Sequence, residues 1–509
     1  MEDPHTAQSM RRQFGTWDAC ALGVMTGSAW PLFGGPKVVM LTFFCAAQET
    51  SLYNGGPPGV IYELVAVCLV YFSITACVAE LASAMPTSAG VYYWATVTGG
   101  RKWGRVLGFY AGWYNAFAYI FATVATSSIS AVQLVQMYAL FRPDYVSQPW
   151  HVLLAYFGCS WISCAIVIFG HRFMARINDV GLVLILAGVL VTIVVCCVMP
   201  AVHGAGYSSN RSVWVEWEND TGYESNGLVF LMGMLNGAFA FGVPGPRTDV
   251  KIDCISHIAE EATKTFAYLI AIFYAAKDVG AVAAMAYLFP ISPIYQQATQ
   301  SVGGTLGLSL LIFLPSFWAI VGGYVTAGRV VWTLGRGNAV PFAGTLGRIS
   351  PTLHNPVNAA LCVAVLNTLI GLIYLGSKTA LSAFATSVVC LNLLAYLAAM
   401  LPHLLSGRQG LLPGVFWMRG WVGATVYGVA CAFIGFFLVI FNFPYSQPVT
   451  AGSMNYTSAV LVGLSIVITA CWIWKRRQGY VVSEAFVEEP SLVNEWEEQH
   501  GENRDKEQA

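Results

Sequence analysis

Twelve stretches of this chain are apolar over about the length that a helix needs to cross a lipid bilayer, roughly 20 residues. They lie near residues 19–46, 58–84, 107–139, 151–170, 178–199, 228–260, 266–289, 303–328, 356–376, 379–402, 421–443 and 456–474. Only 10% of the 509 residues are charged, against about a quarter in soluble domains. We therefore expect an all-α polytopic membrane protein with a transmembrane domain over residues 19–476.

Two polar tails flank the predicted membrane domain. Residues 1–18 show no cleavable signal pattern, and residues 477–509 are acidic and typical of a disordered segment. With twelve crossings, both tails and most Lys and Arg residues fall on the same side of the membrane. Because basic loops stay cytoplasmic, we expect both tails in the cytoplasm.

The loop over residues 200–227 falls on the other side and contains two glycosylation sequons, at Asn210 and Asn219. These sequons agree with the orientation that the basic residues indicate. A third sequon, at Asn455, is expected to lie too close to the membrane to be modified. The 13 cysteines lie mostly in apolar runs and form no CxxC pair, so the pattern favours neither a disulfide framework nor a metal cluster.

Two of the apolar segments are interrupted. In the sixth, Asn236-Gly237 and Gly242 precede Pro244-Gly245-Pro246, and no continuous helix can pass through that run. In the first, Thr26-Gly27-Ser28 precedes Pro31, although a glycine there is equally explained by close packing of helices. Breaks five helices apart are expected of a five-plus-five inverted repeat, in which broken helices bind the transported solute.

Several motifs resemble one family of transporters. They are AELASAMPTSAGVYYW (79–94), NGAFAFG (236–242), DCISHIAEE (253–261), IYQQATQSVGG (294–304), AGRVVWTLGRGNAVPF (327–342), HNPVNA (354–359) and PVTAGSMNYTSAV (448–460). In this order they resemble fungal permeases of the amino acid/polyamine/organocation superfamily, in its gamma-aminobutyrate and choline branch. The resemblance runs from about Gly15 to Tyr480. It implies about 12 transmembrane helices, two five-helix inverted repeats plus two, with helices 1 and 6 discontinuous, and proton-coupled transport by alternating access.

The resemblance and the interruptions together predict a substrate site. The residues assigned to it are Thr26, Gly27, Ser28, Trp30, Asn236, Gly237, Ala238, Phe239 and Phe241. The first three would offer backbone and hydroxyl groups to a carboxylate at a helix N-terminus. The aromatic residues would hold an ammonium group by cation–π attraction. Plain packing is the alternative for them, because 14% of the chain is aromatic.

Charged residues at the predicted cytoplasmic helix ends are candidates for a gate. Glu80 ends the second segment, and the resemblance places it where a closing ion pair with Arg101 would form. Glu260 and Glu261 end the sixth segment in a similar position. All of them have the alternative of being solvated helix ends. Glu63 is the one acid near a helix interior, where acids are functional candidates, although an interfacial position is equally compatible with its place after Pro58.

Other functional classes find little support in the chain. The His257-Ile-Ala-Glu260-Glu261 run lacks the second histidine of a zinc hydrolase, and GVPGPRT lacks the ending of a phosphate loop. A channel would need a filter sequence or a ring of charge. A net charge of −1 does not favour a nucleic-acid partner. We expect no enzymatic activity, cofactor or metal, and the oligomeric state stays open.

The chain departs from the permease pattern around its sixth and seventh segments. The charged stretch GPRTDVKI (245–252) intervenes between the two halves of the sixth, and the seventh follows Glu261 almost at once. Phe266 to Phe289 would then form the seventh crossing. We expect a permease for a small amine-bearing solute in the plasma membrane, or in a vacuolar or other internal membrane. The alternative is a degenerate homologue that acts as a nutrient sensor or is a nonfunctional product.

Overall fold

The computed structural model describes most of the membrane domain. The described residues are 55–87, 89–142, 144–170, 173–203, 206–219, 221–241, 253–277, 289, 291–373, 378–409, 411–451, 453–478 and 480. Both polar tails, the first apolar segment and the inserted 245–252 stretch lie outside them. The predictions for Thr26, Gly27, Ser28 and Trp30 therefore also lie outside the described residues.

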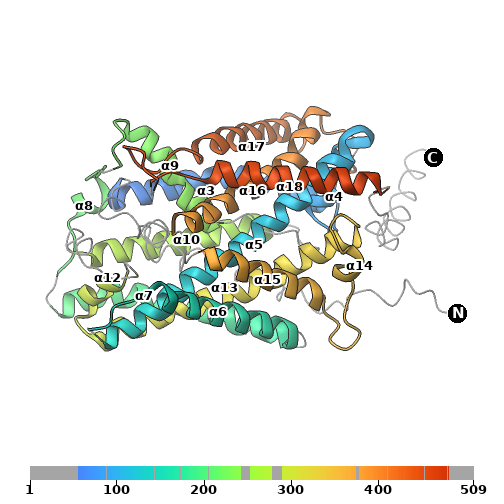
Figure 1. Ribbon diagram of the computed structural model, residues 1–509. Coiled ribbons are helices and arrows are strands. Elements are labelled where there is room, and N and C mark those ends of the chain that lie inside the picture. Colours follow the sequence, from blue (N-terminus) through green and yellow to red (C-terminus); the bar gives the residue numbers. More distant parts are fainter. Residues whose placement is uncertain are drawn as a thin grey trace, which may run out of the picture.

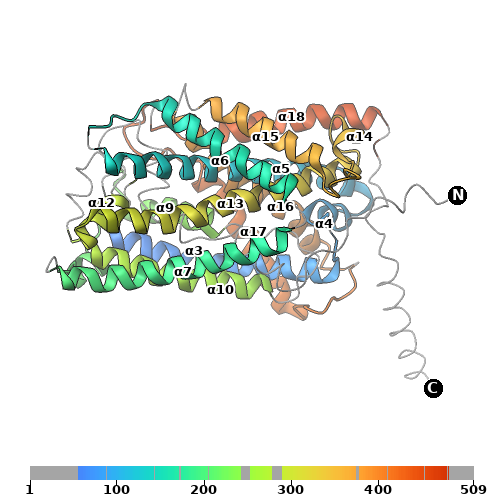
Figure 2. The same ribbon diagram turned by 90° about the horizontal axis from the view of Figure 1, so that it is seen from below.

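Helices that run roughly parallel to one another make up the described part of the chain (Figures 1 and 2). The long ones are α3 (Gly56–Ala84), α5 (Gly100–Phe141), α6 (Pro149–Phe169), α7 (Met174–Val202), α9 (Asn226–Phe241), α10 (Asp253–Ala275), α13 (Val302–Arg336), α15 (Val357–Leu372), α16 (Lys378–Leu405), α17 (Gly420–Ile440) and α18 (Thr457–Arg477). Short helices are α4 (Val91–Thr98), α8 (Asn210–Trp214), α12 (Ile291–Thr299) and α14 (Ala343–Leu346).

Within the described residues, eight helices are long and apolar enough to cross a membrane, and α9 and α15 are shorter apolar helices. Many large side chains on the outer helices are exposed, among them Val183 and Leu190 of α7. In a soluble protein such a surface would be a liability, but lipid solvates it well. These features confirm the predicted all-α polytopic membrane protein.

The central helix of the bundle is α5, which contacts α4, α6, α13, α15, α16 and α18. Small residues allow this close packing. A Cβ at Gly112 would lie 2.7 Å from side-chain atoms of Leu334 and Tyr92, and one at Gly108 would lie 1.9 Å from Thr96 Oγ1. Small residues at helix contacts let backbones approach in a membrane, where lipid gives no hydrophobic drive for helix association.

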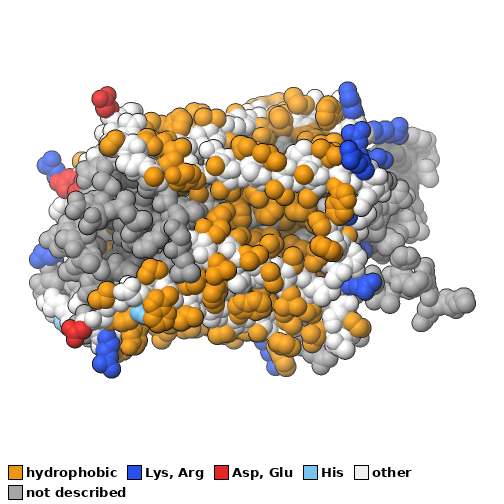
Figure 3. Space-filling model, in the orientation of Figure 1, with side chains coloured by type: hydrophobic (Ala, Val, Ile, Leu, Met, Phe, Trp, Pro, Cys, Tyr) orange, Lys and Arg blue, Asp and Glu red, His pale blue; other side chains and the backbone are white. Residues whose placement is uncertain are grey.

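Lys and Arg gather at the end of the bundle that carries α4, α14 and the last turn of α18, and an apolar band covers the middle (Figure 3). The exposed basic residues there include Arg101, Lys102, Arg105, Arg348 and Arg477. The opposite end, with α8 and α12, carries both signs of charge (Figure 3). We call the first the basic end, and it is the end that we expect to face the cytoplasm.

Hydrogen bonds hold the last turn of α18 and Tyr480 at the basic end. The hydroxyl oxygens of Tyr480 and Tyr92 in α4 lie 2.5 Å apart. Burial raises the pKa of Tyr92, to about 12, and that of Tyr480, so both hydroxyls stay protonated. Lys475 Nζ also donates to Asn338 Oδ1 over 2.8 Å. The last crossing is thereby tied to the ends of α3–α4 and α13.

The structure corrects the predicted boundary between the sixth and seventh segments. α10 is one continuous helix from Asp253 to Ala275, so the expected division between a segment ending at 260 and one over 266–289 is wrong. The run from Glu261 to Phe266 contains no glycine or proline, and nothing in it stops a helix. Lys277 follows the end of α10 and is exposed rather than buried within a crossing.

The two predicted sequons have different surroundings at the end opposite the basic end. Asn210 is exposed at the start of α8, and its Oδ1 accepts a hydrogen bond from Tyr274 over 2.8 Å. Asn219 Nδ2 donates to the Tyr223 carbonyl over 2.9 Å and to Asn226 Oδ1 over 3.0 Å. Glycosylation attaches a sugar through the side-chain nitrogen, and that nitrogen is committed to hydrogen bonds only in Asn219.

We therefore expect Asn210 to be the principal glycosylated residue. Asn210→Gln should remove a glycan and increase the electrophoretic mobility of the protein, whereas Asn219→Gln should leave the mobility nearly unchanged. Treatment of each variant with an endoglycosidase gives the control, because all forms should then migrate together. A larger shift with Asn219→Gln would contradict this prediction.

Candidate functional site

The helix that carries the predicted interruption lies inside the bundle. α9 is described over 16 residues, as far as Phe241, and the sequence continues with Gly242, Pro244 and Pro246, which do not favour a continuous helix. The next described helix, α10, begins at Asp253. Lipid cannot satisfy the peptide groups of an interrupted helix, so protein groups or water must do so. The surroundings of α9 therefore define the candidate site.

One face of α9 packs on α3 through two glycines spaced four residues apart. A Cβ at Gly233 would lie 1.9 Å from Glu63 Oε1, and one at Gly237 would lie 3.1 Å from a methyl group of Val67. The sequence Gly-x-x-x-Gly is a common contact surface between membrane helices. Glu63 and Val67 are also four residues apart, so successive turns of α3 fill the space above successive glycines of α9.

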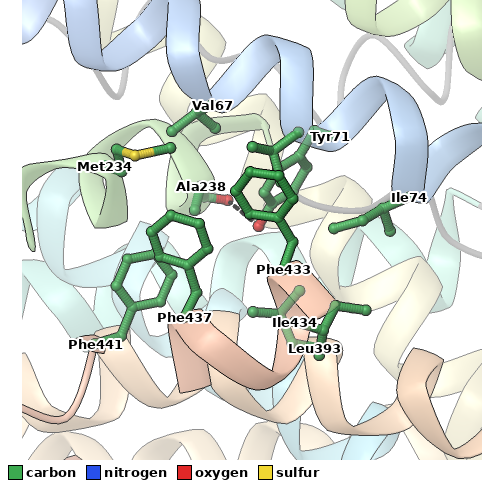
Figure 4. Close-up of a pocket in the computed structure, with 11 residues that line it drawn as sticks. Val67, Tyr71, Ile74, Met234, Ala238, Leu393, Phe433, Ile434, Phe437 and Phe441 are labelled. Atoms are coloured by element: carbon green, nitrogen blue, oxygen red, sulfur yellow. Dashed lines mark hydrogen bonds between the residues drawn. The ribbon is translucent and has the colours of Figure 1, made fainter. Parts of the chain in front are cut away.

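The next turn of α3 satisfies the backbone of α9. The hydroxyl of Tyr71, four residues after Val67, donates to the Ala238 carbonyl over 3.3 Å (Figure 4). Ala238 lies in the last described turn of α9, and carbonyls near the end of a helix need partners from outside it. Tyr71 is buried, so its hydroxyl replaces the water that would otherwise be needed there.

A small apolar cavity lies beside this hydrogen bond, between α3, α9, α16 and α17 (Figure 4). Its lining includes Val67, Tyr71, Met234, Leu393 and Phe437. About 10 Å³ is open to the centre of a water molecule, which is room for one water at most. This cavity is therefore too small to hold an amino acid, and the α3 side of α9 is a packing surface.

The predicted residues of α9 divide between its two faces. Gly237 and the Ala238 carbonyl contact α3, so they position the helix. Phe239 lies two residues after Gly237, about 200° around the helix, and faces away from α3. Asn236 is also buried. Phe241 ends the helix and is buried too.

Buried polar side chains on the neighbouring helices were not predicted from the sequence. Their oxygen or nitrogen atoms have no hydrogen-bond partner among the described residues; they are Asn115, Ser127, Ser130 and Gln133 in α5 and Asn392 in α16. α16 contacts both α5 and α9. Unpaired polar groups are costly in a membrane interior and mark substrate or ion pathways there. Their signal in the sequence was their position within long apolar runs.

At the basic end, Glu80 holds the end of α3 against the α16–α17 loop. Its Oε1 lies 2.6 Å from Arg408 Nη2, and its Oε2 accepts a hydrogen bond from the Met418 backbone over 2.8 Å. The Glu80 side chain is 0% exposed and that of Arg408 is 8% exposed. Ser83, one turn on, accepts a hydrogen bond from the Phe416 backbone. Of the two alternatives for Glu80, an ion pair or a solvated helix end, the structure shows a buried ion pair.

Hydrogen-bond acceptors and aromatic rings surround the Arg408 guanidinium. Nη2 also donates to the Met418 carbonyl over 2.6 Å, and Nη1 donates to that of Gly420 over 3.3 Å. The planar group lies 5.0 Å from the Trp417 ring and 5.5 Å from the Tyr427 ring. Several bonds to one planar cation require an arginine. This pairing corrects the predicted partner of Glu80, because Arg101 is exposed and contributes nothing to it.

The other predicted gate acids are paired within their own helix. Lys264 Nζ lies 3.1 Å from Glu260 Oε1 and 2.6 Å from Glu261 Oε1. Glu261 is buried, whereas Glu260 is exposed. These are pairs at i,i+3 and i,i+4 spacing, which contribute little to stability at a surface. A gating role for Glu260 and Glu261 stays a prediction.

A bundle of apolar helices, with one helix that stops at membrane depth among unpaired polar groups, is the architecture of a membrane transporter. This chain belongs to the amino acid permease family, whose model matches residues 14–466. It is 26% identical to a choline transporter of Saccharomyces cerevisiae, over 96% of this chain and 86% of that protein. It is also 23% identical to amino-acid permease BAT1 of Arabidopsis thaliana, over 87% and 90% respectively.

A further relative shows the range of solutes in the family. The chain is 22% identical to the 7-keto 8-aminopelargonic acid transporter of Saccharomyces cerevisiae, over 83% of this chain and 87% of that protein. The three relatives are named for different amine-bearing compounds. Their names therefore fix the transport class of this chain and leave its solute to be determined.

The glycine contacts on α3 generate the first prediction for this site. Gly233→Ala places a methyl group where the Glu63 carboxyl lies and should destabilise the protein by about 1–3 kcal/mol. Gly237→Ala, whose methyl group would lie 3.1 Å from a methyl group of Val67, is a tight contact rather than an overlap and should cost less. Adding Glu63→Ala should remove most of the cost of Gly233→Ala, because the clash disappears. Thermal unfolding of the detergent-purified variants measures each effect, and an equal cost in both backgrounds would refute the contact.

The ion pair at the basic end generates the second prediction. Glu80→Gln or Arg408→Gln alone leaves the other charge buried and should cost about 3–5 kcal/mol of stability. The double variant should cost clearly less than the sum of the two, since neither charge then remains. Arg101→Gln is the matched control and should leave thermal stability unchanged. Additive costs for the pair, or a large effect of Arg101→Gln, would count against the assignment.

Proposed function

We propose that this protein is a secondary active transporter that moves a small amine-bearing solute across the membrane by alternating access, coupled to protons. An amino acid, gamma-aminobutyrate and choline are the candidate solutes. The observation that carries the proposal is the place of α9 inside the bundle, with Gly242, Pro244 and Pro246 following directly after its last described residue, Phe241. A broken helix at that depth exposes backbone groups that a solute can bind.

The face of α9 that turns away from α3 would line the solute site. Phe239 offers a ring that attracts an ammonium or quaternary amine, worth about 0.5 to 2 kcal/mol. Asn236 offers a buried amide on the neighbouring flank of the helix. Thr26, Gly27, Ser28 and Trp30 of the first segment remain the predicted opposite wall. This set suits a solute with a cationic nitrogen, with or without a carboxylate.

Polar groups of α5 and α16 would complete the lining. Ser127 and Ser130 are three residues apart, so their hydroxyls lie on neighbouring parts of one helix face. Both are fully buried and have no partner in the described part of the chain. Asn392 in α16 has an unpaired Oδ1. Such donors and acceptors would replace the hydration shell that a polar solute gives up on entering the bundle.

Alternating access requires that the two ends open in turn. The pair of Glu80 and Arg408 would keep the basic end closed while the solute site faces the other side. Breaking it exposes two charges to water, where their attraction weakens strongly. We place the transporter in the plasma membrane, with its basic end toward the cytoplasm.

A non-transporting homologue is the second candidate, and α10 is the observation that favours it. In α10 the second half of the sixth segment, from Asp253, continues without a break into the predicted seventh segment as far as Ala275. A permease of the expected pattern would have a loop between these two segments. Sequencing the transcript tests this point directly. A messenger that encodes 245–252 and the short 262–265 link would strengthen the second candidate.

The transport proposal predicts uptake of a labelled amine by cells that lack their own amine permeases. Choline, gamma-aminobutyrate and the proteinogenic amino acids should be tested separately at acidic and neutral external pH. One of them should accumulate faster in cells that express the chain, and a protonophore should abolish the accumulation. Fluorescent tagging in the same cells reports which membrane holds the protein. Correctly inserted protein that accumulates none of these compounds would contradict the proposal.

A further inference from the structure

Glu63 is an acid buried at membrane depth on α3. It is 3% exposed, and its Oε1 has no hydrogen-bond partner among the described residues. An ionised carboxylate in such surroundings costs several kcal/mol unless donors or a cation compensate it. A carboxylic acid that keeps its proton avoids most of that cost. The burial therefore favours the neutral form while the surrounding helices stay in place.

We call the space that holds this carboxyl group the seat, and α9 forms one side of it. A Cβ at Gly233 would lie 1.9 Å from Oε1 and 2.4 Å from Oε2, so the acid fills the space that a side chain of α9 would occupy. Gly233 precedes Asn236 by three residues, which is just under one turn. Any movement of α9 relative to α3 therefore changes the surroundings of this carboxyl directly.

Among the described residues, the elements packed against α3 supply no close charge of opposite sign. α9 and α17 contain no Asp, Glu, Lys, Arg or His. The charged residues of α10 lie between Asp253 and Lys264, in its first half. Near the Glu63 end of α3, α10 brings Tyr274, whose hydroxyl accepts a hydrogen bond from Trp214 Nε1.

The remaining charged and titratable groups at this end of α3 are outside the seat. Arg211 in α8 and Glu216, two residues after α8, are both exposed. Arg211 Nε lies 3.3 Å from Glu216 Oε1. Lys277 after α10 is exposed. On α3 itself, the Tyr62 hydroxyl donates to the Trp214 carbonyl. In α17, Tyr427 donates to the Cys77 carbonyl far along α3, and Cys431 is the other titratable group.

We propose that Glu63 is the proton-binding residue of the transport cycle, with its proton held while Gly233 covers the carboxyl. This inference rests on the proposed transport function and deepens it. When α9 moves with its solute, water reaches the seat, and the acid dissociates to a carboxylate and a released proton. Return of α9 requires that the carboxylate take up a proton from water on the other side. One proton is thus transported in each cycle, and the movement of α9 couples proton transport to solute transport.

The test uses the full chain, purified and reconstituted into lipid vesicles with the membrane potential clamped to zero. Labelled choline, gamma-aminobutyrate and the amino acids serve as probes. With one coupled proton, the steady-state accumulation ratio of the wild type should rise up to about tenfold per unit of pH difference. Glu63→Gln keeps the shape of the neutral acid but cannot release a proton. Its accumulation ratio should fall to about one at every pH difference, while solute exchange at equal concentrations persists.

A matched control distinguishes proton binding from packing. Ser163→Ala removes another fully buried polar group without a partner, from α6, and should keep the accumulation ratio of the wild type. Glu63→Gln that still accumulates solute with the wild-type pH dependence would overturn the role of Glu63. A wild type that shows no pH-driven accumulation of any probe would instead overturn the proposed transport function.

Infrared spectroscopy of the purified chain tests the proton itself without any transport. The carbonyl stretch of a protonated carboxylic acid should be present near neutral pH in the wild type. Glu63→Gln should lose that band, and Ser163→Ala should keep it. An unchanged spectrum in Glu63→Gln would show that Glu63 is ionised in the resting protein and would overturn the proposal even if transport is absent.

Discussion

The lack of water in the bilayer core is the constraint on which this structure depends. Each peptide group there must find a partner within the protein, and a helix that stops halfway leaves several carbonyls without one. The glycine and prolines after Phe241 predict such an interruption for α9, and α3 supplies a partner to its last described turn. The Tyr71 hydroxyl donates a hydrogen bond to the Ala238 carbonyl. Gly233 and Gly237 bring the two helices close enough for that bond. The break can exist because a neighbouring helix is shaped to support it.

α3 performs this role with side chains at a regular spacing. Glu63, Val67 and Tyr71 follow one another at intervals of four residues and therefore share one face of the helix. Two of them fill the space over a glycine, and the third makes a hydrogen bond. Glu80 lies nine residues beyond Tyr71, about half a turn away around the axis, and faces the α16–α17 loop. One helix thus contacts the broken helix on one side and the closed basic end on the other.

The sequence predicted the helical architecture well and the partners of single side chains poorly. Apolar length was enough to place most of the described membrane helices, because it depends on local properties. Glu80 was recognised as important, but Arg408 is 328 residues away, and only the fold brings them together. The division of α10 was predicted wrongly, because the charged residues from Glu260 to Lys264 interrupt the apolar run without interrupting the helix. The burial of Glu63 depended on Gly233, which no local pattern connects to it.

The ion pair of Glu80 also fixes one end of α3, so that a rigid tilt of the helix would turn about that end. Seventeen residues of rigid helix separate Glu80 from Glu63, which corresponds to roughly 26 Å. If α3 tilts by about 5° around Glu80, the Glu63 carboxyl at the other end of that length would move by roughly 2 Å. That displacement approaches the width of a water molecule. A small rotation at one membrane surface would therefore be amplified into hydration of a single acid near the other.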